Sequence, residues 1–480
     1  MISKGGSKMP KFKPYRKNQF MLFPNSIDDY VPENHLSRMI SNIVEQLNTK
    51  DIEDKYSSLG QNTYHPKILI KLLFYGYAIG ERSGRKISSK CETDTAYIYL
   101  AQMYKPDFRT INDFRKNNIL ELSQYFIDIV RMCKELGLIS VGQMNIDGTK
   151  IKAHAANRRT KTKEDYQKWL KRIDDKIQKI LEEAETTDAQ EDQIYQDKRG
   201  DELPEEVNTK EKLKAKIKKV IKKFKNEKEK INLTDPDARF MKDGRYRIDT
   251  SYNCQASLSK EQIMLSSEVV TEASDRKALE LMVETSEVNL EHPIEEVAAD
   301  AGYSSYDNYE YLEKNNKIGY IPDQNFRKDL KKDQDPYHHT HFHYDQDQDL
   351  FLCPKDKILK LYQIRRKDCG YRKFQTKIYK CKDCPSCKKR SLCTRQKYRT
   401  INLEDRRELL LQMRNRLQTE MGRKKYLQRL WTTELVFGHL KYNLGYRHFF
   451  LRSLKKVKGE FRLMCIGWNL KKMHKMMAFS

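Results

Sequence analysis

The sequence predicts a mixed α/β protein in which a helical N-terminal part precedes a mixed sheet covered by helices. Three observations predict this class. Apolar residues recur at helical spacing through residues 1–140. From Gln143 the stretch "QMNIDGTKIKAHA" changes to the two-residue alternation of a strand. Beyond it, strand-like and helix-like stretches follow one another, which is typical of one mixed sheet with helices packed on it.

The charge of the chain favours a polyanionic partner. Lys and Arg number 93 against 68 Asp and Glu, which gives a formal net charge of +25. Nucleic acid is the leading candidate, and an acidic membrane surface is the lesser one. A length of 480 residues is enough for several domains, which excludes a small basic tail. We find no long apolar run, so we expect a soluble cytoplasmic protein with no membrane span.

Residues 1–140 are expected to form a helical DNA-binding domain. "YHPKILIKLLFYGYA" places Pro66 at a helix start, and its apolar face consists of Leu69, Leu72, Leu73 and Gly76. A later helix in "KPDFRTINDFRKNN" has Asp107 as its N-cap. Its polar positions are Arg109, Asn112, Arg115 and Lys116. These residues either enter a DNA groove or form a solvated helix face, and the two interpretations carry equal weight.

Residues 141–330 are expected to form the first part of the sheet domain. After the strand at Gln143, further strand candidates are "RYRIDTSYNCQAS", "IMLSSEVVTE", "EEVAADAGY" and "KIGYIP". Residues 160–232 interrupt the sheet with two charged amphipathic stretches. We expect these stretches to form an antiparallel helical hairpin, whose narrow apolar stripes serve packing or, alternatively, a coiled-coil partner.

Residues 331–402 form a second interruption, which is rich in cysteine. "YKCKDCPSCKKRSLCT" contains Cys381, Cys384, Cys387 and Cys393, and Cys353 precedes it. Two-residue gaps let neighbouring thiolates reach one tetrahedral ion, so we expect a structural Zn²⁺ on these four residues, with Cys353 as a substitute ligand. A loop of reduced thiols is the alternative. The histidines of "YHHTHFHYD" are a weaker source of ligands.

Residues 403–480 return to helical periodicity and are expected to complete the sheet domain. The last stretch, "SLKKVKGEFRLMCIGWNLKKMHKMM", has an apolar face made of Val457, Phe461, Met464 and Trp468. We expect this face to pack into the core. The lysines on the other side of the helix are available to phosphates.

Three acids stand in unusual settings. Asp147 follows the strand "MNI" and precedes a glycine, Asp300 ends "EEVAAD", and Glu434 lies inside the helix "YLQRLWTTELVFGHLKY". If the fold brings them together, their charges repel unless cations neutralise them. Carboxylate oxygens suit Mg²⁺ or Mn²⁺, which support phosphodiester chemistry. Taken singly, each acid is more often a turn former or a surface charge.

The ordered set of motifs resembles a known family. "NIDGTKIKAHA", "VAADAGYSS" and "TELVFGHLKYNLGYRHFFLRSLKKVKGEF" look like the three acidic motifs of DDE transposases from bacterial insertion sequences. "SIDDYVPENHL", "YHPKILIKLLFYGYAIGERSGRKI", "DPDARFM" and "YNCQAS" resemble signatures of the branch with an InsH-like N-terminal domain, in the same order. The resemblance implies a ribonuclease-H-like catalytic domain.

The resemblance also implies roles for individual residues. Asp147 on the first strand would bridge two Mg²⁺ or Mn²⁺ ions, Asp300 on the fourth strand would hold one ion, and Glu434 would hold the other. Related transposases have a Tyr, an Arg and a Lys near the glutamate, and the matching residues are Tyr426, Arg429 and Lys441. The spacing from the arginine to the glutamate is one residue longer here than in the best known version of that signature. Lys441 and Arg447 are expected to contact DNA, because a lysine can hold a phosphate as a point charge.

The implied function is that of a DNA transposase. Such an enzyme cleaves at the ends of its insertion sequence and joins the freed 3′-OH ends to target DNA by two-metal-ion chemistry. Its partners would be double-stranded DNA, as terminal inverted repeats and target, and at least one further copy of the chain, since two ends are joined in one complex. Its place would be the bacterial cytoplasm, at the nucleoid. The alternatives are a domesticated, non-catalytic DNA-binding regulator and a metal-dependent nuclease without strand transfer.

Overall fold

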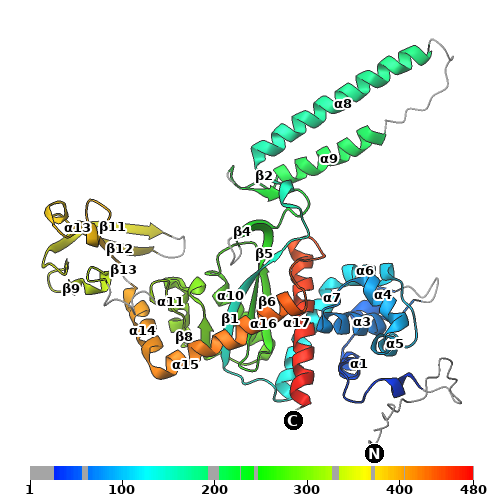
Figure 1. Ribbon diagram of the computed structural model, residues 1–480, viewed down its shortest axis with the longest axis horizontal. Coiled ribbons are helices and arrows are strands. Elements are labelled where there is room, and N and C mark those ends of the chain that lie inside the picture. The colour runs from blue at the N-terminus through cyan, green and yellow to red at the C-terminus, as the bar shows by residue number, and fades with distance from the viewer. Residues whose placement is uncertain are drawn as a thin grey trace, which may run out of the picture.

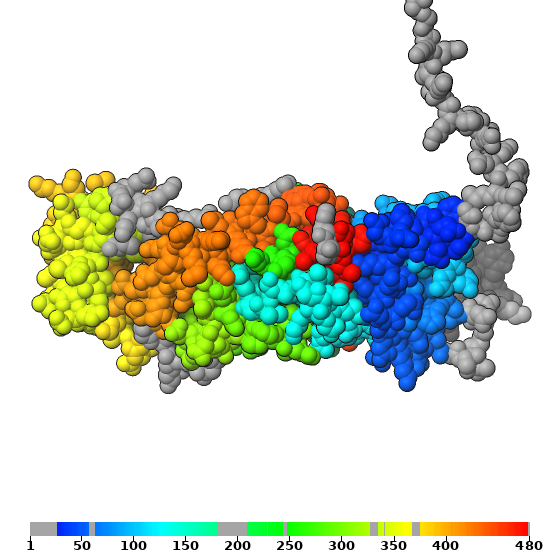
Figure 2. Space-filling view, turned by 90° about the horizontal axis from the view of Figure 1, so that it is seen from below, coloured from blue at the N-terminus to red at the C-terminus, as the bar shows by residue number. Residues whose placement is uncertain are grey.

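The computed structural model describes residues 26–56, 63–192, 205–227, 229–242, 247–326, 335–368, 373–404 and 406–478. Figure 1 shows an elongated body with the N-terminal helices at one end, a mixed sheet in the middle and a smaller second sheet at the other end. A long helical hairpin projects from the middle part. The space-filling view keeps this order along the body, from the N-terminal helices in blue to the second sheet in yellow (Figure 2).

The N-terminal part is built from helices whose boundaries follow the local sequence. They are α1 (Leu36–Gln46), α2 (Lys50–Glu53), α3 (Pro66–Ile79), α4 (Gly84–Thr93), α5 (Thr95–Leu100), α6 (Phe108–Asn117) and α7 (Ile119–Glu135). Pro66 opens α3, because its fixed φ suits the first helical position. Asp94 caps α5, since its carboxylate accepts a hydrogen bond of 3.0 Å from the Ala96 N–H. The apolar face predicted for α3 is fully buried.

The middle part contains a mixed sheet with the order β4-β5-β1-β7-β8, and β6 pairs with β5. Its strands are β1 (Gln143–Lys152), β4 (Arg239–Lys242), β5 (Ile248–Leu258), β6 (Met264–Val270), β7 (Glu296–Ala299) and β8 (Ile318–Tyr320). The pairs among β4, β5, β6 and β1 are antiparallel, whereas β1, β7 and β8 are parallel to one another. Helices α10 (Ala278–Leu290) and α11 (Tyr306–Lys314) precede β7 and β8, as parallel connections require. The mixed α/β class is confirmed.

The last helix, α17 (Leu454–Met477), joins the N-terminal helices to the sheet. It packs against α3 and α7 on one side and against β6 on the other. Its predicted apolar residues Val457, Phe461, Met464 and Trp468 are all buried. Gly467 allows the closest approach, because a Cβ there would lie 2.5 Å from the carbonyl carbon of Tyr77. One apolar core therefore runs through both parts of the molecule.

Two long helices, α8 (Lys163–Asp192) and α9 (Glu205–Ile221), form the projecting hairpin. They share a small apolar cluster of their own that includes Tyr166, Ile173, Ile217 and Val220. A two-stranded sheet of β2 (Thr160–Lys161) and β3 (Ile231–Asn232) closes the base of the hairpin. Within the described residues, we find no helix with the length and apolar composition that a membrane crossing needs.

The second sheet is antiparallel and has the order β13-β12-β11-β10-β9. Its strands are β9 (His343–Asp345), β10 (Leu350–Leu352), β11 (Ile358–Asp368), β12 (Lys373–Cys381) and β13 (Thr400–Glu404). They enclose a separate core that contains Phe342, Phe351, Leu359 and Tyr379. The sequence patterns did not predict these strands, because several are short and β11 alternates little between apolar and polar residues.

Candidate active site

Asp147 and Asp300 lie on neighbouring parallel strands. In the register between β1 and β7, Ile146 pairs with Ala299, and each acid is the next residue of its chain. Asp147 thus lies on the first strand of the sheet, and Asp300 directly follows β7. The Asp300 carboxylate caps a short 3₁₀ helix, Ala301–Tyr303, by accepting a hydrogen bond of 2.8 Å from the Gly302 N–H. Small residues keep this strand end open.

The charge of Asp147 is costly in this position. Burial raises the pKa of Asp147 from 3.8 to about 6, the Arg429 guanidinium opposes this shift, and the negative charge of Asp300 adds to it. Two nearby carboxylates that both ionise repel one another unless a cation lies close. The site therefore favours a positive charge beside the two acids.

Glu434 reaches the same place from the C-terminal segment. Helices α14 (Arg407–Gln418) and α15 (Glu420–Arg429) lead into a π-helix, η7 (Leu430–Glu434). A π-helix bonds each residue to the fifth one along, so residues five apart share a face. Arg429 and Glu434 are five apart, and their side chains form an ion pair of 3.6 Å between Nη2 and Oε1. The extra residue in the sequence spacing is thus absorbed by the π-helix, an element that is typical of functional sites.

Arg429 connects two of the three predicted acids. Its Nη1 lies 3.3 Å from Oδ2 of Asp147 and donates a hydrogen bond of 3.2 Å to Thr433. Its side chain is only 4% exposed, whereas that of Glu434 is 62% exposed. Tyr426 lies against this guanidinium, with 5.7 Å from Cζ to the ring centroid. Arg429 and Tyr426 therefore hold the acids in place from the protein side.

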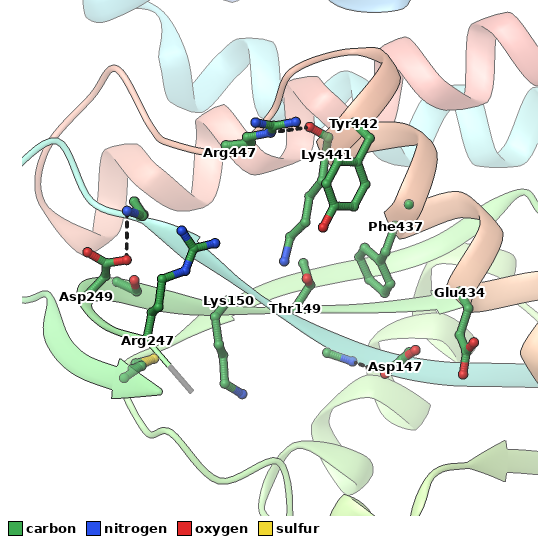
Figure 3. A pocket seen from close by; sticks show the side chains of 15 residues that line it. Asp147, Thr149, Lys150, Arg247, Asp249, Glu434, Phe437, Lys441, Tyr442 and Arg447 are labelled. Carbon is green, nitrogen blue, oxygen red and sulfur yellow. Dashed lines mark hydrogen bonds and ion pairs between the residues drawn. The ribbon is translucent and has the colours of Figure 1, made fainter. Parts of the chain in front are cut away.

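A cleft of about 410 Å³ opens beside these acids. Asp147 and Glu434 line one part of it, and the cations that line it are Lys150, Lys152, Arg247, Lys441 and Arg447. Figure 3 shows Lys441 extending from its helix into the cleft, above the strand that carries Asp147. This helical segment comprises α16 (Leu435–Gly438) and a second π-helix, η8 (His439–Asn443). An acidic end with cations around it suits a phosphodiester, whose charge the cations attract.

A fourth acid, Asp275, supports the site and was missed by sequence reasoning. Its Oδ1 accepts hydrogen bonds from Asn253 at 2.6 Å, Gln255 at 2.7 Å and Lys150 at 3.1 Å. A Cβ on Gly148 would lie 2.9 Å from this oxygen, so the glycine next to Asp147 makes room for the network. Asp275 stands in "EASDRKALE", which has no local pattern that indicates a site.

Comparisons with protein families match two stretches of the chain. Residues 352–474 match a transposase DDE domain, and residues 25–117 match a transposase domain, DUF772. Both matched domains are transposase domains, which is consistent with a DDE transposase. The first match includes Glu434 and Lys441, whereas Asp147 and Asp300 lie outside both matches. It is the structure that places Asp147 beside Asp300 and, through Arg429, near Glu434. A search of the curated proteins finds no relative that matches this chain.

Helix α6 carries the predicted DNA contacts of the N-terminal domain. Asp107 caps it as predicted, with 2.8 Å from its carboxylate to the Arg109 N–H. Arg109 and Lys116 are exposed, and Asn112 is half-buried. Arg115 is a correction, because it is 5% exposed and its guanidinium donates to the Arg82 carbonyl at 2.7 Å and to Asn112 at 3.0 Å. Arg115 is therefore buried and joins α6 to the segment that carries Arg82.

The predicted cysteines surround one small pocket of about 30 Å³. Its lining includes Cys353, Cys381, Cys384, Cys387 and Cys393. Backbone N–H groups of Lys355 and Lys357 donate to Cys353 Sγ at 3.4 and 3.3 Å, and the Arg399 N–H donates to Cys384 Sγ at 3.2 Å. The cysteines of the described residues are free thiols.

The side chains at the acid site and at the cysteine pocket do not form a closed metal cage. Across the described ranges, no group of three or more His, Cys, Asp or Glu side chains is arranged so that it could hold a metal ion. At the acid site, Arg429 lies between Asp147 and Glu434 and supplies the positive charge. The donor set of three carboxylates nevertheless has the chemistry that a hard divalent cation requires.

Proposed function

We propose that this protein is a DNA transposase that cleaves at the ends of its insertion sequence and joins the 3′-OH ends to target DNA. The observation that supports this function is that Asp147 lies next to Asp300 and lines a cationic cleft together with Glu434. Asp147, Asp300 and Glu434 come from three distant segments, and the cleft has the charge that attracts a nucleic acid backbone. The family matches support a transposase in general. A ribonuclease-H-like fold of the mixed sheet is part of this proposal.

The acids would hold the divalent cations that DDE transposases use. Mg²⁺ or Mn²⁺, two ions per site, would lower the pKa of an attacking oxygen and stabilise the leaving one. Asp147, Asp300 and Glu434 would be the residues that hold these ions. Because Glu434 is exposed and stands on a π-helix, it can turn towards the other two acids.

The cations of the cleft would position the DNA. Lys441 extends into the cleft and would hold the phosphate next to the scissile bond, and Arg447 would contact a neighbouring phosphate. Arg429, which pairs with Asp147 and Glu434, would position these acids. Arg109 and Lys116 on α6, with Asn112, would contact DNA outside the cleft. The complex would be a dimer or larger on DNA, because two ends are joined together.

We also propose a structural Zn²⁺ at the cysteine pocket, held by Cys381, Cys384, Cys387 and Cys393, with Cys353 as a substitute ligand. Burial raises the pKa of the Cys393 thiol, and the thiols of Cys384, Cys353 and Cys387 lie close enough to contribute to this shift. Cys381 and Cys384 are both buried and belong to the core of the second sheet. Cysteine sulfur is the ligand that structural zinc sites use most, and these sulfur atoms line one pocket.

The decisive experiment compares the wild type with Asp147→Asn on a labelled duplex that carries a terminal inverted repeat. We expect Asp147→Asn to lose cleavage and to bind the end normally, because the isosteric amide keeps the shape and removes the charge. Asp175→Asn, on the exposed side of α8, is the matched control and should cleave normally.

The outcomes separate the alternatives. Metal-dependent cleavage that survives in Asp147→Asn contradicts the assignment of the site. Cleavage by the wild type without joining to a target plasmid indicates a nuclease. Binding by the wild type without any cleavage indicates a regulator.

A further inference from the structure

Strands β11 and β12 form a long two-stranded ribbon. Their antiparallel register runs from Leu359 opposite Cys381 to Asp368 opposite Lys373. Strand β10 pairs with β11 only at Ile358 and Leu359, and β13 pairs with β12 only over Thr376–Lys380. Over the rest of its described length, β11 is an edge strand. Figure 1 shows the ribbon in the second sheet, at the end of the body opposite the N-terminal helices.

Side chains along β11 are exposed and carry positive charge. Lys360, Arg365 and Arg366 are exposed, as are the apolar residues between them, with Leu361 at 41%, Tyr362 at 60% and Ile364 at 41%. Within the part of the chain that the structure describes, Arg365 and Arg366 form no ion pair. Charges on an edge strand prevent pairing with another chain. They also leave an uncompensated positive surface, which attracts polyanions.

One pair of cations in the ribbon opposes its stability. Lys360 lies directly across from Lys380, and like charges at such positions destabilise a sheet. The Lys380 ammonium is held 4.3 Å from the ring centroid of Tyr362 and 4.0 Å from that of Tyr398. These rings partly offset the repulsion between Lys360 and Lys380. A bound polyanion would neutralise both lysines and so remove the remaining repulsion.

An acid that contacts this sheet does not cancel the charge of β11. Asp349 pairs with Lys377 at 3.0 Å and accepts a hydrogen bond of 2.6 Å from the Tyr344 hydroxyl. These bonds lower the pKa of Asp349 to about 2. Its charge is thus neutralised locally, and the cations of β11 stay available.

We propose that the β11–β12 ribbon is a second DNA-contact surface, which enters the major groove of duplex DNA apart from the catalytic cleft. The major groove is wide enough for a two-stranded β-ribbon. Arg365 and Arg366 contact phosphates or base edges, and Tyr362 packs against the sugar or a base. The ribbon shares with the proposed function only the premise that the ligand is DNA. It adds a contact at the end of the body, outside the residues that line the cleft.

The test uses the full-length protein and the double variant Arg365→Glu/Arg366→Glu. Both side chains are exposed, so the fold should tolerate the change. Binding to a labelled end duplex and to a random duplex is measured by fluorescence anisotropy over a series of KCl concentrations. We expect a loss of roughly tenfold or more near 0.1 M salt, and a slope of log K against log salt that is smaller by about 2. Tyr362→Ala should weaken binding with an unchanged slope.

Lys218→Glu/Lys219→Glu is the matched control, because these exposed adjacent lysines lie on α9, away from the ribbon. An equal loss in this control would show that only overall charge matters and would overturn the proposal. Wild-type affinity and slope in the ribbon variant overturn it as well, while leaving the proposed function intact. If the wild-type protein binds no duplex at all, both proposals fail. The affinity for single-stranded DNA is measured in the same way. If the ribbon variant loses as much affinity for single-stranded DNA as for duplex DNA, the ribbon does not bind in the major groove.

Discussion

The acid site and the β11–β12 ribbon differ in how the protein treats charge. Asp147 is largely buried, repelled by Asp300 and attracted by a guanidinium that is 4% exposed. On the ribbon, Arg365 and Arg366 are exposed on an edge strand. Buried charges need fixed partners, because the interior screens them poorly. Exposed charges need none and are screened by salt. We therefore expect the first region to determine chemistry and the second to determine affinity.

The two regions also differ in the apolar core that supports each of them. The acid site stands on a sheet that shares one core with the N-terminal helices. The second sheet has a small core of its own. A change in one core should therefore leave the other largely unaffected, and single substitutions in each region can test this separation.

The largest effect is expected from the acids. Asp300→Asn should lower single-turnover cleavage at saturating DNA by roughly a thousandfold or more, because it removes a carboxylate next to Asp147 that would bind a cation. Asp275→Asn should cost much less, roughly tenfold, since Asp275 is bonded to Asn253, Gln255 and Lys150 and acts through them. The ribbon variant should cleave at the wild-type rate once DNA is saturating. A rate loss in the ribbon variant equal to that of Asp300→Asn would erase the distinction.

The next effect concerns the shared core. Gly467→Ala places a Cβ 2.5 Å from the carbonyl carbon of Tyr77 and should lower the free energy of unfolding by about 3 kcal/mol. Hydrogen exchange should lose protection in α3 and β1 together and keep it in β12. Gly438→Ala is the control, because a Cβ added there would have no neighbouring atom within 4 Å. If β12 lost as much hydrogen-exchange protection as α3 and β1, the core of the second sheet would not be independent of the shared core.

A smaller effect is expected from the pKa of Asp147. Because burial raises this pKa to about 6, the folded protein binds the proton more tightly than the unfolded chain does. The stability from this group is fully present below about pH 4 and is lost as pH rises through about 6. Asp147→Asn avoids the loss, so in EDTA it should be more stable than the wild type by roughly 1–3 kcal/mol at pH 7.5 and similar to it at pH 4. Urea unfolding across this range measures the difference, and parallel curves would contradict it.

The smallest effect on the main body is expected from the cysteine pocket. Cys387→Ser should reduce the zinc content of the purified protein from one ion per chain to none, as measured by elemental analysis. It should weaken the second sheet and leave the unfolding of the shared core unchanged. Cys133→Ala, in α7, is the control and should keep the ion. Zinc-free wild-type protein would disprove the proposed site.

The sequence allowed part of this arrangement to be foreseen. Regular periodicity predicted α3, α17 and the long strands, because each buries one face along its whole length. The same approach missed the short strands of the second sheet. It also placed Arg115 on a polar face, although the guanidinium bonds to Arg82 across a contact between helices. A contact between distant segments does not change the spacing of apolar residues in either segment, so periodicity cannot predict it.

What the sequence by itself determined is the set of chemical groups: two acids at strand ends, a third in a helix, and an excess of cations. Only the tertiary structure decided that Ile146 and Ala299 lie side by side, so that Asp147 and Asp300 become neighbours. It also decided that a π-helix turns Arg429 and Glu434 to one face. The physical reason is that strand order and helix winding depend on packing over the whole core, whereas residue type and spacing are local.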